Sequence, residues 1–434
     1  MKSILLLHKS KIWILGGQML SSGSSFILVV LLGKYLMLEG LGVFSLGIII
    51  AQLFLTVNQA LVIKPMYTLG IKAVETGNKN YFSQLFGLQA LLLIAYLIIA
   101  YLLCLLNPFL FPATDLELIN SFLPFTVVGV VLFDFVKKRA LAIGRSFLAL
   151  KMDVLYVFFL FGGMYMLKYL SVFNLKNVFA LYTGIFLFVG LLFGTPLIRF
   201  NGFMSIKSLF RQQWSFVSWI WASSVVQWFS GNIFVLVAGS IIGPAVVGAF
   251  RLVQNIMGVI HVLFAAIENY VPVSASKIYL HSNFKQLRKY LESSFFKTGV
   301  LYLTFLLPLL LFPEWILRQV YNAEAIVHAG LLRLLGIGYF FIVLNIFLAF
   351  MFRTIENTRS IFKAYFNNLL LSLLFVYPLL KLFGATGIVL GILSGQLVMT
   401  ITYFVLLQRK QNIENFKPSS YAKDNSFIIG KSQS

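Results

Sequence analysis

Apolar residues dominate the chain in continuous runs of about 20 residues, and short stretches between the runs hold most of the charge. A run of that length matches a helix that crosses a hydrocarbon layer about 30 Å thick. An outer-membrane barrel would need shorter, alternating segments. The pattern predicts an all-α polytopic membrane protein with twelve spans, at about 12–33, 41–63, 84–106, 119–136, 152–168, 177–198, 214–239, 247–273, 295–312, 328–351, 362–383 and 386–407. The first run lacks an A-x-A-like cleavage site, which predicts a retained span.

The basic residues predict the orientation of these spans. The chain has 34 Lys and Arg against 13 Asp and Glu, a net charge of +21. When successive loops are assigned to alternate sides, 27 of the 34 basic residues fall on the side of the N-terminus and five on the other, while Arg251 and Arg333 lie within spans. The positive-inside rule then puts both termini in the cytoplasm. Topology accounts for the excess positive charge, so we expect no nucleic acid as a partner.

The two halves of the chain resemble each other. A shift of 206 residues aligns Gly33 with Gly239, Gly42 with Gly248 and Phe44 with Phe250. Six spans separate the matched segments, so the halves are expected to be parallel repeats with a central cavity and a substrate site between them. The predicted divisions are an N-terminal six-helix bundle, an amphipathic cytoplasmic linker, a C-terminal six-helix bundle and a disordered cytoplasmic tail, at 1–199, 200–213, 214–408 and 409–434.

Two cytoplasmic stretches mix aromatic and aliphatic residues with Lys and Arg. They are residues 199–213 and residues 277–297. This composition is typical of amphipathic helices that lie at a membrane surface, where anionic lipid attracts the basic face. A solvated charged loop is the alternative for each stretch.

The eighth span carries a polar stripe. Its members fall three or four residues apart and so share one helical face: Arg251, Gln254, Asn255, Gly258, His261, Glu268 and Asn269. The stripe is about 25 Å long at the helical rise. Lipid would not tolerate such a face, so we expect it to line a cavity between the two bundles. The alternative is that these residues form hydrogen bonds with neighbouring helices.

Residues 31–54, LLGKYLMLEGLGVFSLGIIIAQLF, and residues 237–256, VAGSIIGPAVVGAFRLVQNI, carry a family resemblance. They resemble the polysaccharide exporter family, which includes O-antigen and related lipid-linked oligosaccharide translocases, within the multidrug/oligosaccharidyl-lipid/polysaccharide exporter superfamily. Residues 271–295 resemble the Pro-containing end of the eighth helix in that family and its basic loop. One departure is the first turn, where Leu36 to Gly40 replace the Gly-Pro that the second half keeps as Gly243-Pro244.

The resemblance implies a flippase that works by alternating access. Its cargo would be an undecaprenyl-diphosphate-linked oligosaccharide, moved to the periplasmic face of a bacterial inner membrane for surface polysaccharide synthesis. The implied partners are this lipid-linked glycan, membrane lipids and other polysaccharide assembly proteins. No cofactor is expected.

The proposed cargo makes particular side chains candidates. Cations would offset the desolvation of the diphosphate, and amides and hydroxyls would meet the glycan. The predicted substrate-binding residues are Arg251, Arg333, Lys64, Gln254, Asn255, Gln52, Gln18 and Gln227. Glu268 and His261 are candidates for ion coupling, since His titrates near neutrality and a buried carboxylate shifts upward. The alternative for both is a structural hydrogen bond or a local ion pair.

Other polar residues have more limited predicted roles. Serines accompany Gln18 on the first span, at Ser21, Ser22 and Ser25, and the first, second, seventh and eighth spans are expected to line the mouth of the cavity. Asp134 and Asp153 flank a basic loop, and we expect each to pair with a Lys or Arg.

Two other functions remain open. An ion-coupled multidrug exporter of the same superfamily would need acidic residues for cationic drugs, whereas the membrane charges here include two arginines. A membrane glycan polymerase or glycosyltransferase would normally need acidic or Arg-bearing outer loops. The sequence contains no metal motif, phosphate loop or nucleophile–base set, so we predict a transporter rather than an enzyme.

Overall fold

The computed structural model describes residues 2–67, 70, 81–114, 116–194, 203–282 and 284–411. Every regular element in these ranges is helical. In chain order the elements of the first half are α1 Lys2–Tyr35, α2 Met37–Asn58, the π-helical turn η1 Gln59–Ile63, α4 Tyr81–Leu110, α5 Glu117–Asn120, α6 Leu123–Ala142, α7 Ser146–Tyr169 and α8 Leu175–Gly194. Those of the second half are α9 Phe203–Ile241, α10 Pro244–His281, α11 Phe284–Leu311, α12 Pro313–Val320, the 3-10 turn η3 Ala323–His328, α13 Ala329–Thr354, α14 Thr358–Phe383 and α15 Ala385–Gln411.

The predicted membrane class is confirmed. Within the described residues, ten helices are long and apolar enough to cross a membrane. Two further helices, α6 and α10, coincide with the predicted fourth and eighth spans. Helix α6 is 20 residues long and carries charge at Asp134, Lys137, Lys138 and Arg139, and part of α10 lies outside the described side chains. The chain is therefore a multi-pass helical membrane protein.

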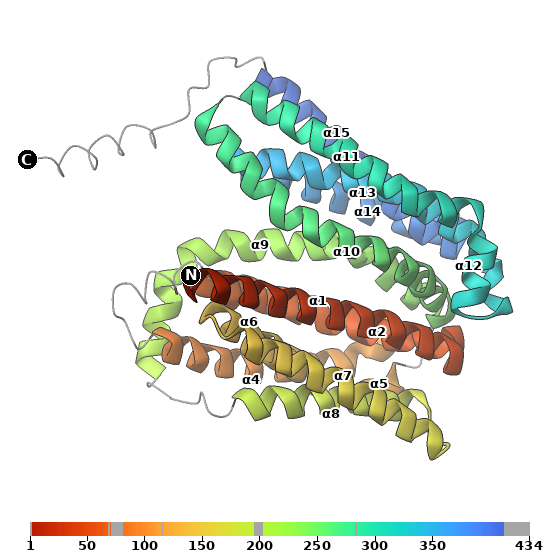
Figure 1. Ribbon diagram of the computed structural model, residues 1–434. Coiled ribbons are helices and arrows are strands. Elements are labelled where there is room, and N and C mark those ends of the chain that lie inside the picture. The colour runs from red at the N-terminus through yellow and green to blue at the C-terminus, as the bar shows by residue number, and fades with distance from the viewer. Residues whose placement is uncertain are drawn as a thin grey trace, which may run out of the picture.

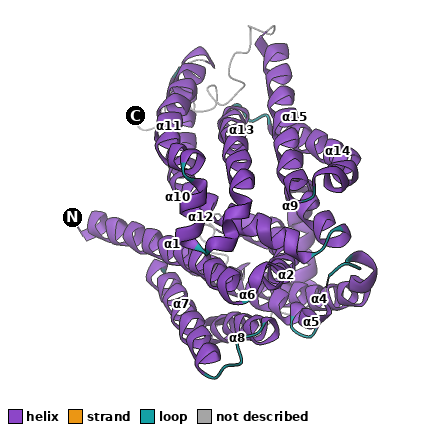
Figure 2. Ribbon diagram, turned by 90° about the vertical axis from the view of Figure 1, so that its right-hand side faces the viewer, coloured by secondary structure: helices purple, strands orange, loops and turns teal. Residues whose placement is uncertain are grey.

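The helices form two bundles, one for each half of the chain. The first bundle holds α1, α2, α4, α6, α7 and α8, and the second holds α9, α10, α11, α13, α14 and α15 (Figures 1 and 2). Helices α2 and α10 pack most extensively across the boundary, with further contacts from α1 and α9. In Figure 1 the bundles converge at the end that carries α12 and diverge toward the end where the N-terminus lies. We call the α12 end the outer end, following the orientation that the loop charges predict.

The two stretches predicted as surface helices have a different structure. Residues 284–297 are the first turns of α11, which continues without a break to Leu311. Residues 203–213, the described part of the predicted linker, are the first turns of α9. Both segments are helical, and each continues into the helix of the following span rather than forming a helix of its own. Their predicted position at the membrane surface stays a prediction. The predicted tail lies outside the described residues from residue 412.

A pair of glycines joins the halves near the outer end. A Cβ added to Gly42 would lie 2.5 Å from the carbonyl carbon of Pro244, and one added to Gly248 would lie 2.7 Å from that of Leu38. The shift of 206 residues relates Leu38 to Pro244 as it relates the two glycines. Each glycine therefore packs on the backbone of the other's counterpart, the reciprocal contact expected of a two-fold relation. We call this contact the glycine crossing.

The turns that precede α2 and α10 also correspond. Gly243, with φ 120°, stands before Pro244 at the start of α10, and the shift of 206 residues aligns it with Met37, which has φ 56°. Both turns thus use a backbone conformation that favours glycine. The first half keeps a positive φ at the corresponding position even though its sequence departs from Gly-Pro.

Candidate functional site

A cavity of about 810 Å³ lies where the first bundle meets the second. One wall comes from α1, and the others come from α10, α11 and α13. Its lining residues are Met19, Ser21, Ser22, Gly23, Ser25, Phe26, Ile27, Arg251, Gln254, Asn255, Gly258, Phe305 and Tyr339. We call this space the central cavity. Its walls combine serine hydroxyls, amides and one guanidinium with aromatic rings.

Arg251 is the charged residue of the central cavity. Its Nη1 donates a hydrogen bond of 2.8 Å to Oε1 of Gln254, one turn further along α10. The groups that lie within electrostatic range of its charge are the phenols of Tyr182, Tyr321 and Tyr339. Among the ion pairs of the described residues, none includes Arg251. The guanidinium is therefore oriented by an amide without being neutralised by a carboxylate there, which leaves a positive charge for an anionic ligand.

Asn255 connects the cavity wall to both halves. Its Nδ2 lies 3.1 Å from the carbonyl oxygen of Phe26 on α1 and 3.1 Å from the hydroxyl of Tyr321. The Tyr321 hydroxyl in turn donates to the carbonyl oxygen of Leu252 at 3.0 Å. Burial raises the pKa of Tyr321 to about 12, so the phenol keeps the proton that this bond needs. This network links α1, α10 and the segment between α12 and η3.

The glycine crossing lies directly beyond this network. Gly248 precedes Arg251 by one helical turn on α10, on the side of the outer end. At the crossing, α2 and α10 approach so closely that a single methyl group would clash. The two halves thus meet backbone to backbone between Arg251 and the outer end.

The structure brings part of the predicted polar stripe together. Arg251, Gln254, Asn255 and Gly258 line the cavity, as expected for that face of the eighth span. The serines predicted to accompany them on the first span, Ser21, Ser22 and Ser25, face them from α1. The side chains of His261 and Glu268 lie outside the described residues, so their proposed part in ion coupling stays a prediction.

Other predicted binding residues are not among the lining residues. Gln18 is exposed on α1, one turn from Ser21, and Gln52 is half-buried on α2. Gln227 on α9 donates to the hydroxyl of Tyr365 at 3.0 Å. Helices α2 and α9 contribute no described residue to the cavity wall, whereas α11 and α13 do. The expectation that the second and seventh spans help to line the mouth between the halves therefore stays a prediction.

The two other predicted cations have partners elsewhere. The Lys64 ammonium donates to Oγ of Ser224 at 3.0 Å and joins the end of η1 to α9. Arg333 pairs with Glu314 at 2.9 Å and donates to the carbonyl oxygen of Leu310 at 3.1 Å, near the outer end of α13. The structure places neither residue with Arg251.

Asp134 and Asp153 each pair with a lysine, as the sequence predicts. Lys137 lies 2.6 Å from the buried carboxylate of Asp153, and Lys138 lies 3.2 Å from Asp134. The first pair joins α6 to α7, and its carboxylate faces Gly17 on α1. These contacts tie the inner ends of three helices together. Within the described residues, no group of three or more His, Cys, Asp or Glu could hold a metal ion.

Sequence reasoning did not identify the aromatic part of the site. Phe26, Phe305 and Tyr339 line the cavity, and Tyr321 supports it from the outer segment. Aromatic residues are abundant throughout the chain, so their presence in a span carries little information. Tyr321 follows a Pro-initiated helix in one of the two longer outer segments, which is the one signal that could have drawn attention to it.

Comparisons with known proteins agree with this architecture. Residues 220–378 match the model of the MatE family. No curated protein matches the chain. A structure of the lipid II flippase MurJ in an inward closed conformation is similar, with a TM-score of 0.71 and 14% identity over 93% of this chain and 87% of that one.

Two further structures extend the likeness. An inward-facing multidrug resistance MATE family transporter of the MOP superfamily gives a TM-score of 0.67 with 17% identity, over 93% of this chain and 96% of that one. A MOP superfamily transporter from Pyrococcus furiosus gives 0.59 with 15% identity, over 95% and 96%. At these identities the likeness concerns the fold. Residues 220–378 thus match the MatE family, and the chain has the two-bundle fold of the MOP superfamily transporters.

Proposed function

We propose that the protein is a flippase for an anionic lipid-linked oligosaccharide, an undecaprenyl-diphosphate-linked repeat unit, in a bacterial cytoplasmic membrane. It would move this cargo from the cytoplasmic to the periplasmic face for surface polysaccharide synthesis, with polysaccharide assembly proteins and membrane lipids as partners. The observation that carries the proposal is Arg251, a cation on the wall of the central cavity whose described partner is an amide rather than a carboxylate.

The chemistry of the cavity suits such a cargo. A diphosphate that enters the low-dielectric layer needs a fixed cation, and a guanidinium offers paired donors to phosphate oxygens. Gln254, Asn255 and the serines of α1 can meet glycan hydroxyls. The aromatic rings of Phe26 and Tyr339 offer flat apolar faces to sugar rings. The volume of about 810 Å³ lies in the range of pockets that hold ligands.

Alternating access is the mechanism that we infer for this site. The bundles converge at the outer end, where the glycine crossing lies, so cargo would enter from the cytoplasmic side. Separation of α2 from α10 at the crossing, with a compensating approach of the bundles at their inner ends, would expose Arg251 to the periplasm. The glycine crossing suits a gate of this kind, because one movement of α2 away from α10 breaks both of its reciprocal contacts at once.

A multidrug exporter is the second candidate. The match to the MatE family and the likeness to a multidrug resistance transporter favour it. The aromatic lining of the cavity could also stack on a drug. Against it, the described lining residues include no acid that would attract a cationic drug. The likeness to a lipid II flippase shows that a protein with this fold can carry a lipid-linked cargo.

The proposal is tested by export in cells that carry the chain's own glycan pathway. Wild type, Arg251→Ala and Arg251→Lys are compared at matched membrane levels, with Arg318→Gln as a control that removes an exposed arginine from α12. We expect both Arg251 variants to reduce surface polymer and to accumulate lipid-linked repeat units on the cytoplasmic side, with Lys retaining more export than Ala.

Three outcomes would count against the proposal. Normal export by both Arg251 variants would remove this residue from the site. If deletion of the protein left the distribution of lipid-linked glycans unchanged and raised sensitivity to cationic drugs, the multidrug function would replace the flippase function. A polymerase would instead reveal itself by normal transfer of repeat units to the periplasm with a block in chain growth.

A further inference from the structure

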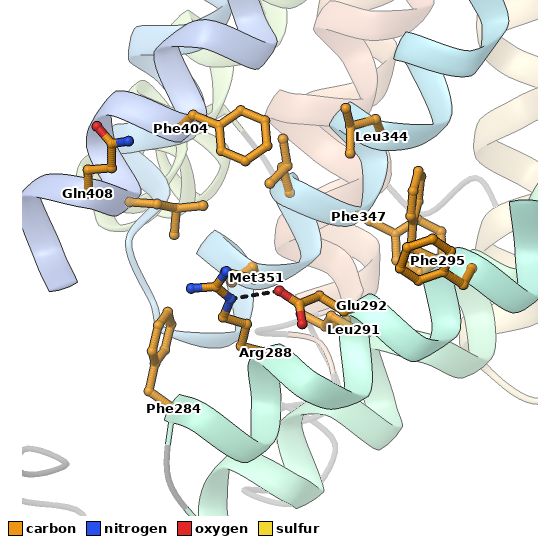
Figure 3. Close-up of a pocket in the computed structure, with 13 residues that line it drawn as sticks. Phe284, Arg288, Leu291, Glu292, Phe295, Leu344, Phe347, Met351, Phe404 and Gln408 are labelled. Carbon is orange, nitrogen blue, oxygen red and sulfur yellow. Dashed lines mark hydrogen bonds and ion pairs between the residues drawn. The ribbon is translucent and has the colours of Figure 1, made fainter.

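A second, smaller cavity lies in the C-terminal bundle, apart from the central cavity. Its volume is about 250 Å³, and α11, α13 and α15 form its walls (Figure 3). It lies beside the first turns of α11 and the last turns of α13 and α15, at the end of the bundle that the loop charges place in the cytoplasm. We call it the inner groove.

The inner groove has an apolar floor and an open mouth. Phe347, Leu348 and Met351 of α13 are buried beneath it, whereas Phe296 of α11 and Phe404 of α15 are exposed at its rim. Helices α11 and α13 pack together, as do α13 and α15, but α11 and α15 scarcely touch. The groove therefore opens sideways between α11 and α15, on the lateral surface of the bundle that faces lipid in a membrane.

The polarity of the groove changes along its length. Arg288, Glu292 and Gln408 lie at the cytoplasmic end, and Phe295 and Leu344 lie further into the membrane (Figure 3). Phospholipids have the same gradient, with a polar headgroup at the interface and chains below it. A water-soluble ligand that approaches from the cytoplasm would reach only the polar end of the groove.

The charge at the polar end favours an anion. Arg288 donates through Nε to Glu292 at 2.7 Å, which orients the guanidinium and leaves its terminal nitrogens at a half-exposed position. Lys285 and Lys289, both exposed, are neighbours of Arg288 on the same helix. Three cations against one carboxylate leave a positive balance at the height of the lipid headgroups.

We propose that the inner groove is a binding site for one anionic phospholipid of the cytoplasmic leaflet. A chain lies on the floor formed by Phe347, Leu348 and Met351, and the phosphate meets the terminal nitrogens of Arg288, with Gln408 across the mouth. Glu292 acts as a positioning residue that holds the guanidinium in place. This site is independent of the cargo of the central cavity.

The test measures lipid binding to the purified full-length protein in detergent by native mass spectrometry. The probes are dioleoylphosphatidylglycerol and dioleoylphosphatidylcholine, which have the same chains and differ in headgroup charge. The variants are Arg288→Gln, which removes the proposed phosphate partner, and Leu344→Trp, which fills the groove. Lys285→Gln is the matched control, because it removes an equal charge from an exposed position that does not line the groove.

We expect one phosphatidylglycerol to bind in preference to phosphatidylcholine. Arg288→Gln should weaken phosphatidylglycerol binding about fivefold, the effect of one basic residue at an anionic interface. It should weaken phosphatidylcholine binding less, because the choline cation already offsets the charge of that lipid's phosphate, so the preference for phosphatidylglycerol should shrink. Leu344→Trp should remove the bound lipid of either kind, while Lys285→Gln should resemble wild type.

Three results would overturn the proposal. Equal binding of the two lipids would mean that the groove takes any chain without regard to charge. An equal loss in Lys285→Gln and Arg288→Gln would mean diffuse attraction to a basic surface without a site. Undiminished binding in a folded Leu344→Trp variant, with wild-type thermal stability, would place the lipid elsewhere on the protein.

Discussion

Substitution of Gly248 by alanine should open the outer end of the central cavity. The added Cβ would lie 2.7 Å from the carbonyl carbon of Leu38 and closer still to its oxygen. Ordinary contact between such atoms needs about 3.5 Å, so α2 and α10 must separate by at least about 1 Å at the crossing. Overpacking of this kind costs about 1–3 kcal/mol. The cost applies only to the conformation in which the crossing is closed, and it therefore shifts the population toward the outward-open one.

Cysteine labelling measures this shift. A Ser25→Cys reporter on the cavity wall, in a Cys104→Ala background, is treated with a membrane-impermeant maleimide from the periplasmic side. A penalty of about 1.4 kcal/mol corresponds to a tenfold change in population, so we expect labelling about ten times faster with Gly248→Ala than without it. Gly42→Ala should act in the same direction, and the double variant should fall short of the sum because both methyl groups widen one contact.

Gly231→Ala is the matched control for this experiment. It is also a helical glycine, on α9, but a Cβ there meets nothing within 4 Å. It should leave labelling unchanged and stabilise the fold slightly, since alanine loses less backbone entropy than glycine in a helix. If Gly248→Ala and Gly231→Ala gave the same labelling rate and the same thermal stability, the closed crossing would not control access and the reasoning would fail.

Three further predictions concern stability. Met37→Gly should raise thermal stability by about 1 kcal/mol in detergent, because Met37 holds the positive φ for which the second half uses Gly243; no gain would mean that the turn relaxes without strain. Asp153→Asn should destabilise the first bundle by about 3–5 kcal/mol, because it leaves the Lys137 charge without its carboxylate. Adding Lys137→Met should recover much of that loss in the same melting assay. A double variant as unstable as Asp153→Asn alone would contradict the ion-pair account. Tyr321→Phe should cost about 1–3 kcal/mol, since the Leu252 carbonyl loses a buried hydrogen bond, and an unchanged melting temperature would show that water replaces the phenol.

Much of the architecture follows from hydropathy alone. Lipid cannot satisfy backbone groups, so every long apolar run must be a helix, and the predicted spans agree with the long helices of the structure. The repeat was visible for a related reason. Glycines are required where two backbones touch, and Gly42 and Gly248 keep their spacing because each packs on the other half. Periodicity likewise placed Arg251, Gln254 and Asn255 on one face.

Composition did not show where one helix ends and the next begins. The basic, aromatic stretch 284–297 has the composition of an interfacial helix, yet it continues into α11, because helix propagation depends on backbone hydrogen bonds that composition does not reveal. Arg333, like Arg251, is an arginine within a predicted span and was the second candidate after it. The difference is Glu314, which lies 2.9 Å away only because α12 folds back against α13.

The sequence by itself determined the membrane class, the twofold repeat and the polar face of α10, because each depends on periodicity or on a solvent that accepts few side chains. Only the tertiary structure decided which helices enclose the central cavity, which of the predicted cations lines it, and that Phe26, Tyr321 and Tyr339 gather around it. These properties depend on the angle and depth at which two bundles meet. That meeting is set by close contacts such as the glycine crossing, which join residues about 200 positions apart. Neither segment shows in its own sequence which residue of the other half it contacts.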